Sequence, residues 1–151
     1  EVLEIGKGKI IKEGKKIALL NFGARLQECL KASKNLDTKG ISTTVVDARF
    51  AKPLDTKLIM DLCFNHEVLI TIEEGSIGGF GSHVFQMLSD RGIFDKGLKI
   101  RSMILPDQFL DQDTPENMYK AAGLDAKSIE QKAIDTLKSN IVIPKIKNLV
   151  N

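Results

Sequence analysis

The sequence predicts an α/β domain in which helices cover both faces of a five-stranded, mostly parallel sheet. Short apolar segments alternate with amphipathic segments of about ten residues, which is typical of consecutive βαβ units. Right-handed crossovers would place helices on both faces, giving a three-layer α/β/α arrangement. The connection after the first strand is too short for a crossover, so we expect the first strand to run antiparallel to the others.

The expected strands follow from apolar or β-branched composition between turn residues. Gly14 and its neighbours turn the chain after the first strand, Gly23 follows the second, and Gly40 precedes the third. In chain order, the expected strands span residues 8–12, 17–22, 42–46, 68–72 and 99–105.

The expected helices follow from apolar residues that recur on one side of a helical period. Two helix starts are marked more specifically, because Thr114 and Asp125 are suitable N-caps and Pro115 suits the first helical position. The helices are expected over residues 25–36, 53–63 and 82–90, then from Pro115 to a stop at Gly123, and from Asp125 to about Ser139.

A chain of 151 residues suits one domain, which we place over residues 1–140. Residues 141–151 are apolar, contain Pro144 and lack a helical period, so we expect a tail that is extended or disordered, or that lies on a partner surface. Because the chain begins with Glu1 rather than Met, we expect it to be a piece of a longer protein.

Composition argues against several classes of partner. The 22 basic and 20 acidic residues leave a net charge of +2, which indicates neither a nucleic-acid partner nor an anionic membrane. No apolar run approaches the roughly 20 residues of a membrane-spanning helix. Cys29 and Cys63 are far apart, so we expect buried free thiols in a reducing cytoplasm.

The segment Val68–Val84 is the most informative part of the chain. A predicted strand is followed by two glutamates, a glycine loop and a predicted helix, the arrangement by which open α/β sheets build sites at strand ends; the loop glycines are Gly75, Gly78, Gly79 and Gly81. Its free N–H groups would suit an anion. However, the loop matches neither a P-loop nor the dinucleotide fingerprint, and the neighbouring carboxylates would repel phosphate. We therefore interpret it as a tight turn that allows close backbone approach.

Few side chains near this loop could perform chemistry. Glu73 and Glu74 should point to opposite sides of the strand end, so we expect one to pair with an arginine and the other to be solvated. Arg49, at the same sheet edge, is the predicted partner in a partly buried ion pair. His83 could act as a neutral base at a helix N-terminus, but no nucleophile is placed with it, so we expect a structural or interface role. His66 should face solvent, and no spacing indicates a metal site.

Four segments together resemble the C-terminal domain of the 1-deoxy-D-xylulose-5-phosphate synthases: LNFGARL (Leu20–Leu26), VVDARFAKPLD (Val45–Asp55), HEVLITIEEGSIGGFGSHV (His66–Val84) and LPDQFLDQDTPENMYKAAGLDAKSI (Leu105–Ile129). The second and third would fit any transketolase-type C-terminal domain. LPDQFLDQ and AGLDA, in the last segment, indicate the synthases. Many members carry His-Gly where Gln112-Asp113 stands here, which would mark a subgroup.

The resemblance implies a homodimeric bacterial enzyme of the cytoplasm that condenses pyruvate with glyceraldehyde 3-phosphate and releases CO2, for isoprenoid, thiamine and pyridoxal synthesis. It implies thiamine diphosphate and Mg2+ bound by two preceding domains, with no catalytic, cofactor-binding or metal residue in this chain, which alone should be inactive. Its expected work is packing against those domains and dimer assembly. The candidate contact residues are Arg49, Glu73, Glu74, Gly78, Gly79, Gly81 and His83.

Two other functions remain open. The chain could be the subunit-docking domain of a 2-oxoacid dehydrogenase β subunit or of another transketolase-like enzyme, although LPDQFLDQ argues against this. It could also be a free-standing sensor that binds a small anion at the glycine loop, although the acidic neighbours of the loop make this the weakest of the three hypotheses.

Overall fold

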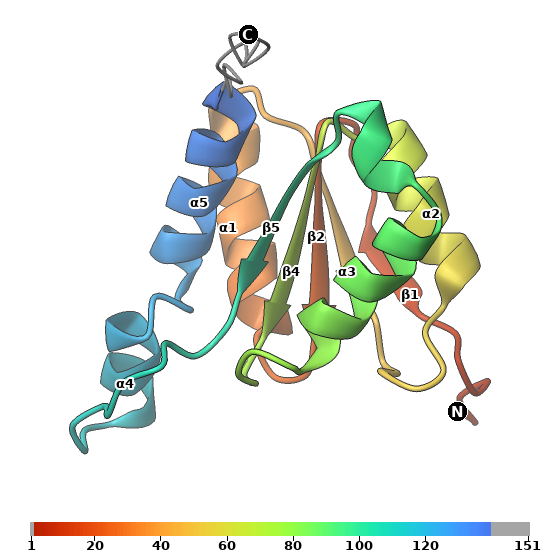
Figure 1. The fold of residues 1–151 in the computed structure, drawn as a ribbon. Coiled ribbons are helices and arrows are strands. Elements are labelled where there is room, and N and C mark those ends of the chain that lie inside the picture. Colours follow the sequence, from red (N-terminus) through yellow and green to blue (C-terminus); the bar gives the residue numbers. More distant parts are fainter. Residues whose placement is uncertain (1, 140–151) are drawn as a thin grey trace, which may run out of the picture.

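A five-stranded sheet forms the centre of the structure, a computed structural model that describes residues 2–139 (Figure 1). The strands are β1 (Lys9–Lys12), β2 (Ile17–Phe22), β3 (Thr43–Asp47), β4 (Val68–Glu73) and β5 (Lys99–Met103), in the spatial order β1-β3-β2-β4-β5. Strands β2 to β5 pair in parallel, whereas β1 pairs antiparallel with β3. The predicted fold class and the antiparallel first strand are therefore confirmed.

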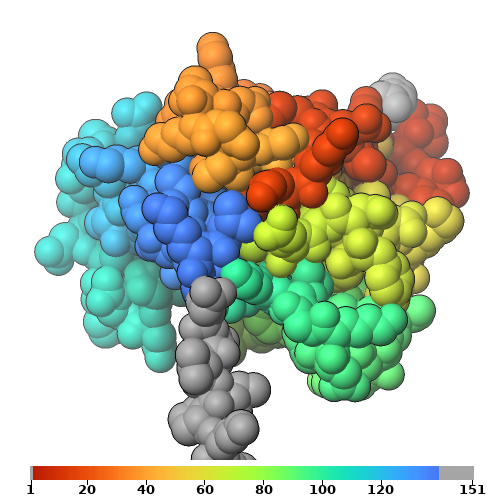
Figure 2. Space-filling model, turned by 90° about the horizontal axis from the view of Figure 1, so that it is seen from above, coloured from red at the N-terminus to blue at the C-terminus, as the bar shows by residue number. Residues whose placement is uncertain are grey.

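Helices cover both faces of this sheet. On one face lie α1 (Leu26–Thr38) and α5 (Ala126–Lys138), and on the other lie α2 (Thr56–Asn65) and α3 (Phe80–Asp90) (Figure 1). A view onto the end where the parallel strands begin shows α1 and α5 packed side by side (Figure 2). The short helix α4 (Pro115–Ala121) lies beyond the opposite end of the sheet.

Alternating residues of the central strands fill two separate apolar layers. Toward α1 and α5 the strands direct residues such as Leu19 and Ile70, and toward α2 and α3 they direct Leu20 and Leu69, all fully buried. This alternation is the two-residue period of a strand. It continues to the end of β4, where Glu73 faces the α3 side, and it decides the roles of the two glutamates described below.

Several element boundaries differ from those predicted. Helix α2 begins at Thr56 rather than at residue 53, because Asp55 is its N-cap and accepts the N–H of Leu58 at 3.0 Å. Helix α3 begins at Phe80, two residues early, for a reason given below. The 3-10 helix η1 (Ile93–Lys96) was not predicted. The predicted caps Thr114 and Asp125 are confirmed, and the predicted tail lies outside the described residues.

The two cysteines are buried free thiols, as predicted. Burial raises the pKa of Cys29 to about 12 and that of Cys63 to about 11, so both sulfurs stay protonated at neutral pH. Among residues 2–139, no helix combines the length and the apolar character that a bilayer-spanning segment needs.

Candidate functional site

The carboxyl ends of the four parallel strands lie together at one end of the sheet, the lower end in Figure 1, which we call the carboxyl edge. In open α/β sheets this edge is where ligands bind. The segments that follow the strands here are the turn after β2, the segment 48–55 after β3, the glycine loop 74–79 after β4, and the segment 104–114 after β5, which leads into α4. All seven candidate contact residues named from the sequence lie in or beside these segments.

Glu73 is the centre of the glycine loop. Its side chain is buried, and its carboxylate accepts the backbone N–H of Phe80 at 3.0 Å and that of Gly81 at 2.5 Å. These are donors that the first turn of α3 cannot satisfy internally, and the negative charge lies at the positive end of the helix. The place where such a helix would hold a phosphate is therefore occupied by a carboxylate of the protein itself.

The glycines make room for this carboxylate. A Cβ atom at Gly75 or Gly79 would lie 2.3 Å or 2.1 Å from Oε1 of Glu73, and one at Gly81 would lie 2.8 Å from Oγ1 of Thr71. Such distances are too short for any side chain. The glycines do allow a close approach, as interpreted from the sequence, but the group that approaches is the Glu73 side chain rather than a second backbone segment.

Glu74 points to the other face and forms an ion pair with Arg25. The distance from Nε of Arg25 to Oε1 of Glu74 is 2.8 Å. The contact is an ion pair only, because the direction of the N–H group does not suit a hydrogen bond between these two atoms. The guanidinium carbon of Arg25 also lies 3.4 Å from the ring centroid of Tyr119. Hydrogen bonding with the Glu74 carboxylate raises the pKa of the Tyr119 phenol. This cluster joins the start of α1, the glycine loop and α4.

The prediction that Arg49 pairs with a carboxylate of the glycine loop is wrong. Nε of Arg49 lies 3.8 Å from Oδ2 of Asp47, two residues earlier in the chain. The physical reason is strand order, because β2 lies between β3, which precedes Arg49, and β4, which precedes the glutamates. Arg25 follows β2, the direct neighbour of β4, and therefore takes the predicted role. The expectation of one solvated glutamate is also wrong, since Glu73 is buried.

The two histidines have structural surroundings. His83 is half-buried on α3, in a shallow groove that it shares with Pro53 and Leu54. The prediction that His66 faces solvent is wrong, because its ring is half-buried and lies 2.7 Å from Oγ1 of Thr44 and 2.9 Å from the carbonyl oxygen of Leu62. The Thr44 hydroxyl beside the His66 ring accepts the N–H of Gly14 at 2.9 Å and lies 3.1 Å from the Gly14 carbonyl oxygen, so this hydroxyl is bound into the backbone rather than presented to a substrate.

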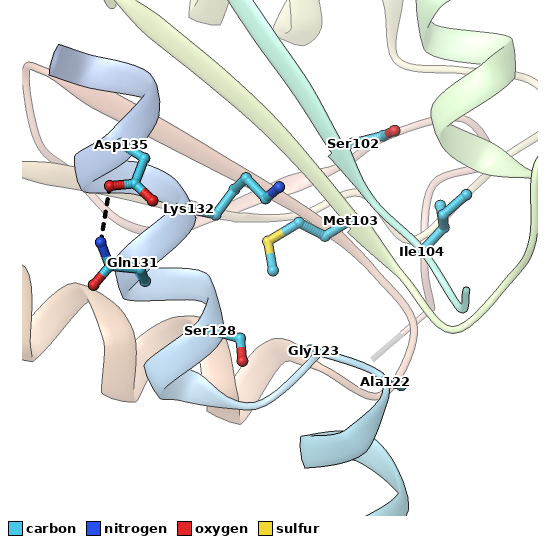
Figure 3. A pocket seen from close by; sticks show the side chains of 9 residues that line it. All are labelled: Ser102, Met103, Ile104, Ala122, Gly123, Ser128, Gln131, Lys132 and Asp135. Carbon is cyan, nitrogen blue, oxygen red and sulfur yellow. Dashed lines mark hydrogen bonds between the residues drawn. The ribbon is translucent and has the colours of Figure 1, made fainter. Parts of the chain in front are cut away.

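A further hollow lies beside the outer edge of β5, between that strand and α5. Figure 3 shows Met103 and Lys132 pointing toward each other across it, whereas Ser102 points away. Asp135 accepts a hydrogen bond from Gln131 at 2.8 Å. The lining of this hollow includes neither histidine nor cysteine, so it offers no histidine-based acid–base pair and no thiol nucleophile. Within residues 2–139, no three His, Cys, Asp or Glu side chains are grouped so that they could hold a metal ion.

Two comparisons with known proteins agree with this architecture. The family described as "Transketolase, C-terminal domain" matches residues 6–129. Among solved structures, the chain is similar to one described as a split gene transketolase, inactive β4 tetramer, with 32% sequence identity and a TM-score of 0.79. The match covers 91% of this chain and 45% of that transketolase chain, so this chain spans less than half the length of that protein.

Proposed function

This chain belongs to the transketolase C-terminal domain family, and on that premise we propose that it is the non-catalytic C-terminal domain of a 1-deoxy-D-xylulose-5-phosphate synthase. Such an enzyme joins pyruvate and glyceraldehyde 3-phosphate with loss of CO2. In this proposal the domain packs against the preceding catalytic domains and takes part in a cytoplasmic homodimer. The reaction machinery lies outside this chain.

The observation that carries the non-catalytic part of the proposal is the hydrogen bonding of Glu73. At the carboxyl edge, where a ligand would bind, this buried carboxylate accepts the N–H groups of Phe80 and Gly81, and three glycines leave the space that it fills. A second charged group there, Glu74, is paired with Arg25. The polar groups of this edge therefore connect parts of the domain to each other, which supports a structural role.

Transketolase-family enzymes use thiamine diphosphate, so the fit of this chain to the cofactor matters. The N-terminus of α3 does not fit a diphosphate, because the Glu73 carboxylate already fills it and would repel a second anion. The described residues also lack a grouped set of metal ligands for Mg2+. We therefore assign both groups, in the intact enzyme, to residues outside this chain.

The choice of the synthase over other members of the family depends on sequence. The segment LPDQFLDQ (Leu105–Gln112) forms most of the connection from β5 to α4, and AGLDA (Ala122–Ala126) connects α4 to α5. These two segments support the synthase. The alternative is the C-terminal docking domain of a 2-oxoacid dehydrogenase β subunit or of another transketolase-like enzyme, for which stable binding to a lipoyl-carrier protein would be evidence.

A reconstitution experiment tests the proposal. The chain is first titrated alone with thiamine diphosphate and Mg2+ by calorimetry, with pyruvate and glyceraldehyde 3-phosphate supplied while product is followed. We expect neither binding nor turnover. The chain is then added to a separately purified polypeptide that carries the two preceding domains of the synthase, and we expect synthase turnover to rise with added chain. Cofactor binding by the chain alone would contradict the proposal and would direct attention to Glu73, Glu74 and His83.

A further inference from the structure

The carboxyl edge of the sheet also carries the most exposed apolar side chains of the described residues. Phe109 is fully exposed, and Val2, Ile77 and Ile5 are 99%, 79% and 75% exposed. Ile77 lies in the glycine loop and Phe109 in the segment after β5, while the chain near Ile5 lies against Pro53, which follows β3. Figure 1 places the N-terminal segment and the segment after β5 at opposite sides of the molecule, so Val2 and Ile5 do not share a patch with Phe109, whereas the glycine loop that carries Ile77 is joined to the Phe109 segment. Exposed apolar groups on neighbouring segments indicate a contact surface, whereas single scattered ones do not.

Phe109 is presented by a segment that is held at both ends. At its start, the N–H of Leu105 donates to the carbonyl oxygen of Gly75 at 2.9 Å, which ties the segment to the glycine loop. At its far end, α4 is held through Tyr119, whose ring lies under the Arg25 guanidinium. Between these points the N–H of Gln108 donates to the carbonyl oxygen of Pro106 at 2.8 Å. An aromatic side chain on a pre-organised segment loses little conformational entropy on binding, which is typical of an anchor residue.

The charged residues next to Phe109 in the sequence are all acidic. Residues 104–117 contain four carboxylates and no Lys or Arg; the four are Asp107, Asp111, Asp113 and Glu116. The chain on both sides of the aromatic anchor is therefore acidic, and we call this segment, residues 104–117, the acidic rim. A partner that fits this surface needs an apolar pocket for the ring and basic side chains around that pocket, because complementary charge favours association and like charge opposes it.

We propose that Phe109 is the anchor by which this domain docks onto the preceding catalytic domains, in an apolar pocket rimmed by Lys or Arg. The inference rests on the proposed function, and it names the contact face and the chemistry of the partner. The chain spans 45% of the matched transketolase chain, so a protein of that kind has further polypeptide against which this face can lie. Charge favours that partner over a second copy of the same face, whose own acidic rim would repel it.

The test uses calorimetry between this chain and the polypeptide that carries the two preceding domains. Phe109→Ala should weaken binding by about 30-fold or more, the effect expected of an anchor residue. Phe64→Ala is the matched control, since Phe64 is also exposed but lies on α2, away from this edge. It should change the affinity by less than about threefold. Asp111→Lys should weaken binding, and the difference from wild type should shrink as salt is added. Circular dichroism and thermal melting establish that each variant is folded.

The possible outcomes separate this inference from the proposed function. Equal binding by wild type and Phe109→Ala would overturn the anchor, even if the reconstituted enzyme makes the synthase product. If Phe109→Ala loses binding but the wild-type complex acts on other transketolase substrates, the anchor stands and the synthase assignment is overturned. Sedimentation of the chain alone covers the remaining case: self-association that Phe109→Ala abolishes would make a second copy the occupant and overturn the inference. Failure of the wild-type chain to bind would overturn both.

Discussion

The carboxylate of Glu73 accepts the backbone N–H of Gly81, so the last residue of β4 holds the first turn of α3. This contact crosses the whole glycine loop. It explains why α3 begins at Phe80, and it places a fixed negative charge where an α/β enzyme would bind a phosphate. The same residue therefore stabilises the loop and excludes an anion from it.

Replacing Glu73 by Gln should lower the free energy of unfolding by about 2 kcal/mol. The amide keeps the shape of the side chain but loses the charge, and its NH2 group would face backbone donors instead of accepting from them. Urea unfolding followed by circular dichroism measures the change. Ser89→Ala, exposed near the other end of the same helix, is the control and should have little effect. A loss of only a few tenths of a kcal/mol for Glu73→Gln would contradict the capping role.

The sequence predicted the layers of the fold because they depend on local patterns. Residues 68–72 form a buried strand as expected, and Thr114 and Asp125 cap helices as expected, since each signal lies within a few residues of its effect. The two apolar layers follow from the same alternation along the strands. These features required no knowledge of which strands are neighbours.

The details of the site depended on such knowledge and were missed. Arg49 was expected to reach the glycine loop, but strand order gives that position to Arg25. The start of α3 was placed late, because its capping group is Glu73, seven residues before Phe80 and outside any local capping pattern. For Arg25, the available signal was the turn after β2, which becomes informative only once β2 and β4 are known to pair.

Gly79→Ala and Gly78→Ala should differ, although the two positions are adjacent. Gly79 has an ordinary backbone φ of −81°, but its Cβ would lie 2.1 Å from Oε1 of Glu73, which the N–H of Phe80 holds in place. We expect a loss of about 3 kcal/mol from overpacking. Gly78 has a φ of +97° and open space around it, so alanine there should cost about 1 kcal/mol from backbone strain alone. Equal losses in chemical denaturation would contradict the steric account.

The contact between α1 and α5 should weaken at acid pH. A hydrogen bond from Lys39, and to a smaller extent one from Asn35, lowers the pKa of the Glu130 carboxyl below its ordinary value of 4.5. Because the pKa is lowered in the folded state, the stabilisation is fully present above pH 4.5 and is lost as the pH falls through the folded value. Glu130→Gln should therefore cost about 0.5–1 kcal/mol at neutral pH, and nothing once the wild-type carboxyl is also protonated. Denaturation at a series of pH values measures this, and a constant difference would contradict it.

The Arg25–Glu74–Tyr119 cluster can be tested directly, because Tyr119 is the single tyrosine of a chain without tryptophan. Ultraviolet titration of the phenol thus reports Tyr119 alone. Its pKa is raised above the ordinary 10.0 by hydrogen bonding with the Glu74 carboxylate, which favours the neutral phenol over a second negative charge. Glu74→Gln should move the pKa back toward 10. Arg49→Met, which removes an arginine paired only weakly with Asp47, should leave it unchanged.

The same cluster should hold α4 against the rest of the domain. Arg25→Met removes both the ion pair with Glu74 and the contact with the Tyr119 ring, so we expect a loss of about 2 kcal/mol, against less than about 1 kcal/mol for Arg49→Met. Amide hydrogen exchange should show where this loss acts. In Arg25→Met, residues 115–121 should exchange faster while the central strands keep their protection relative to global unfolding. Unchanged exchange in α4 would show that contacts other than this cluster hold the helix.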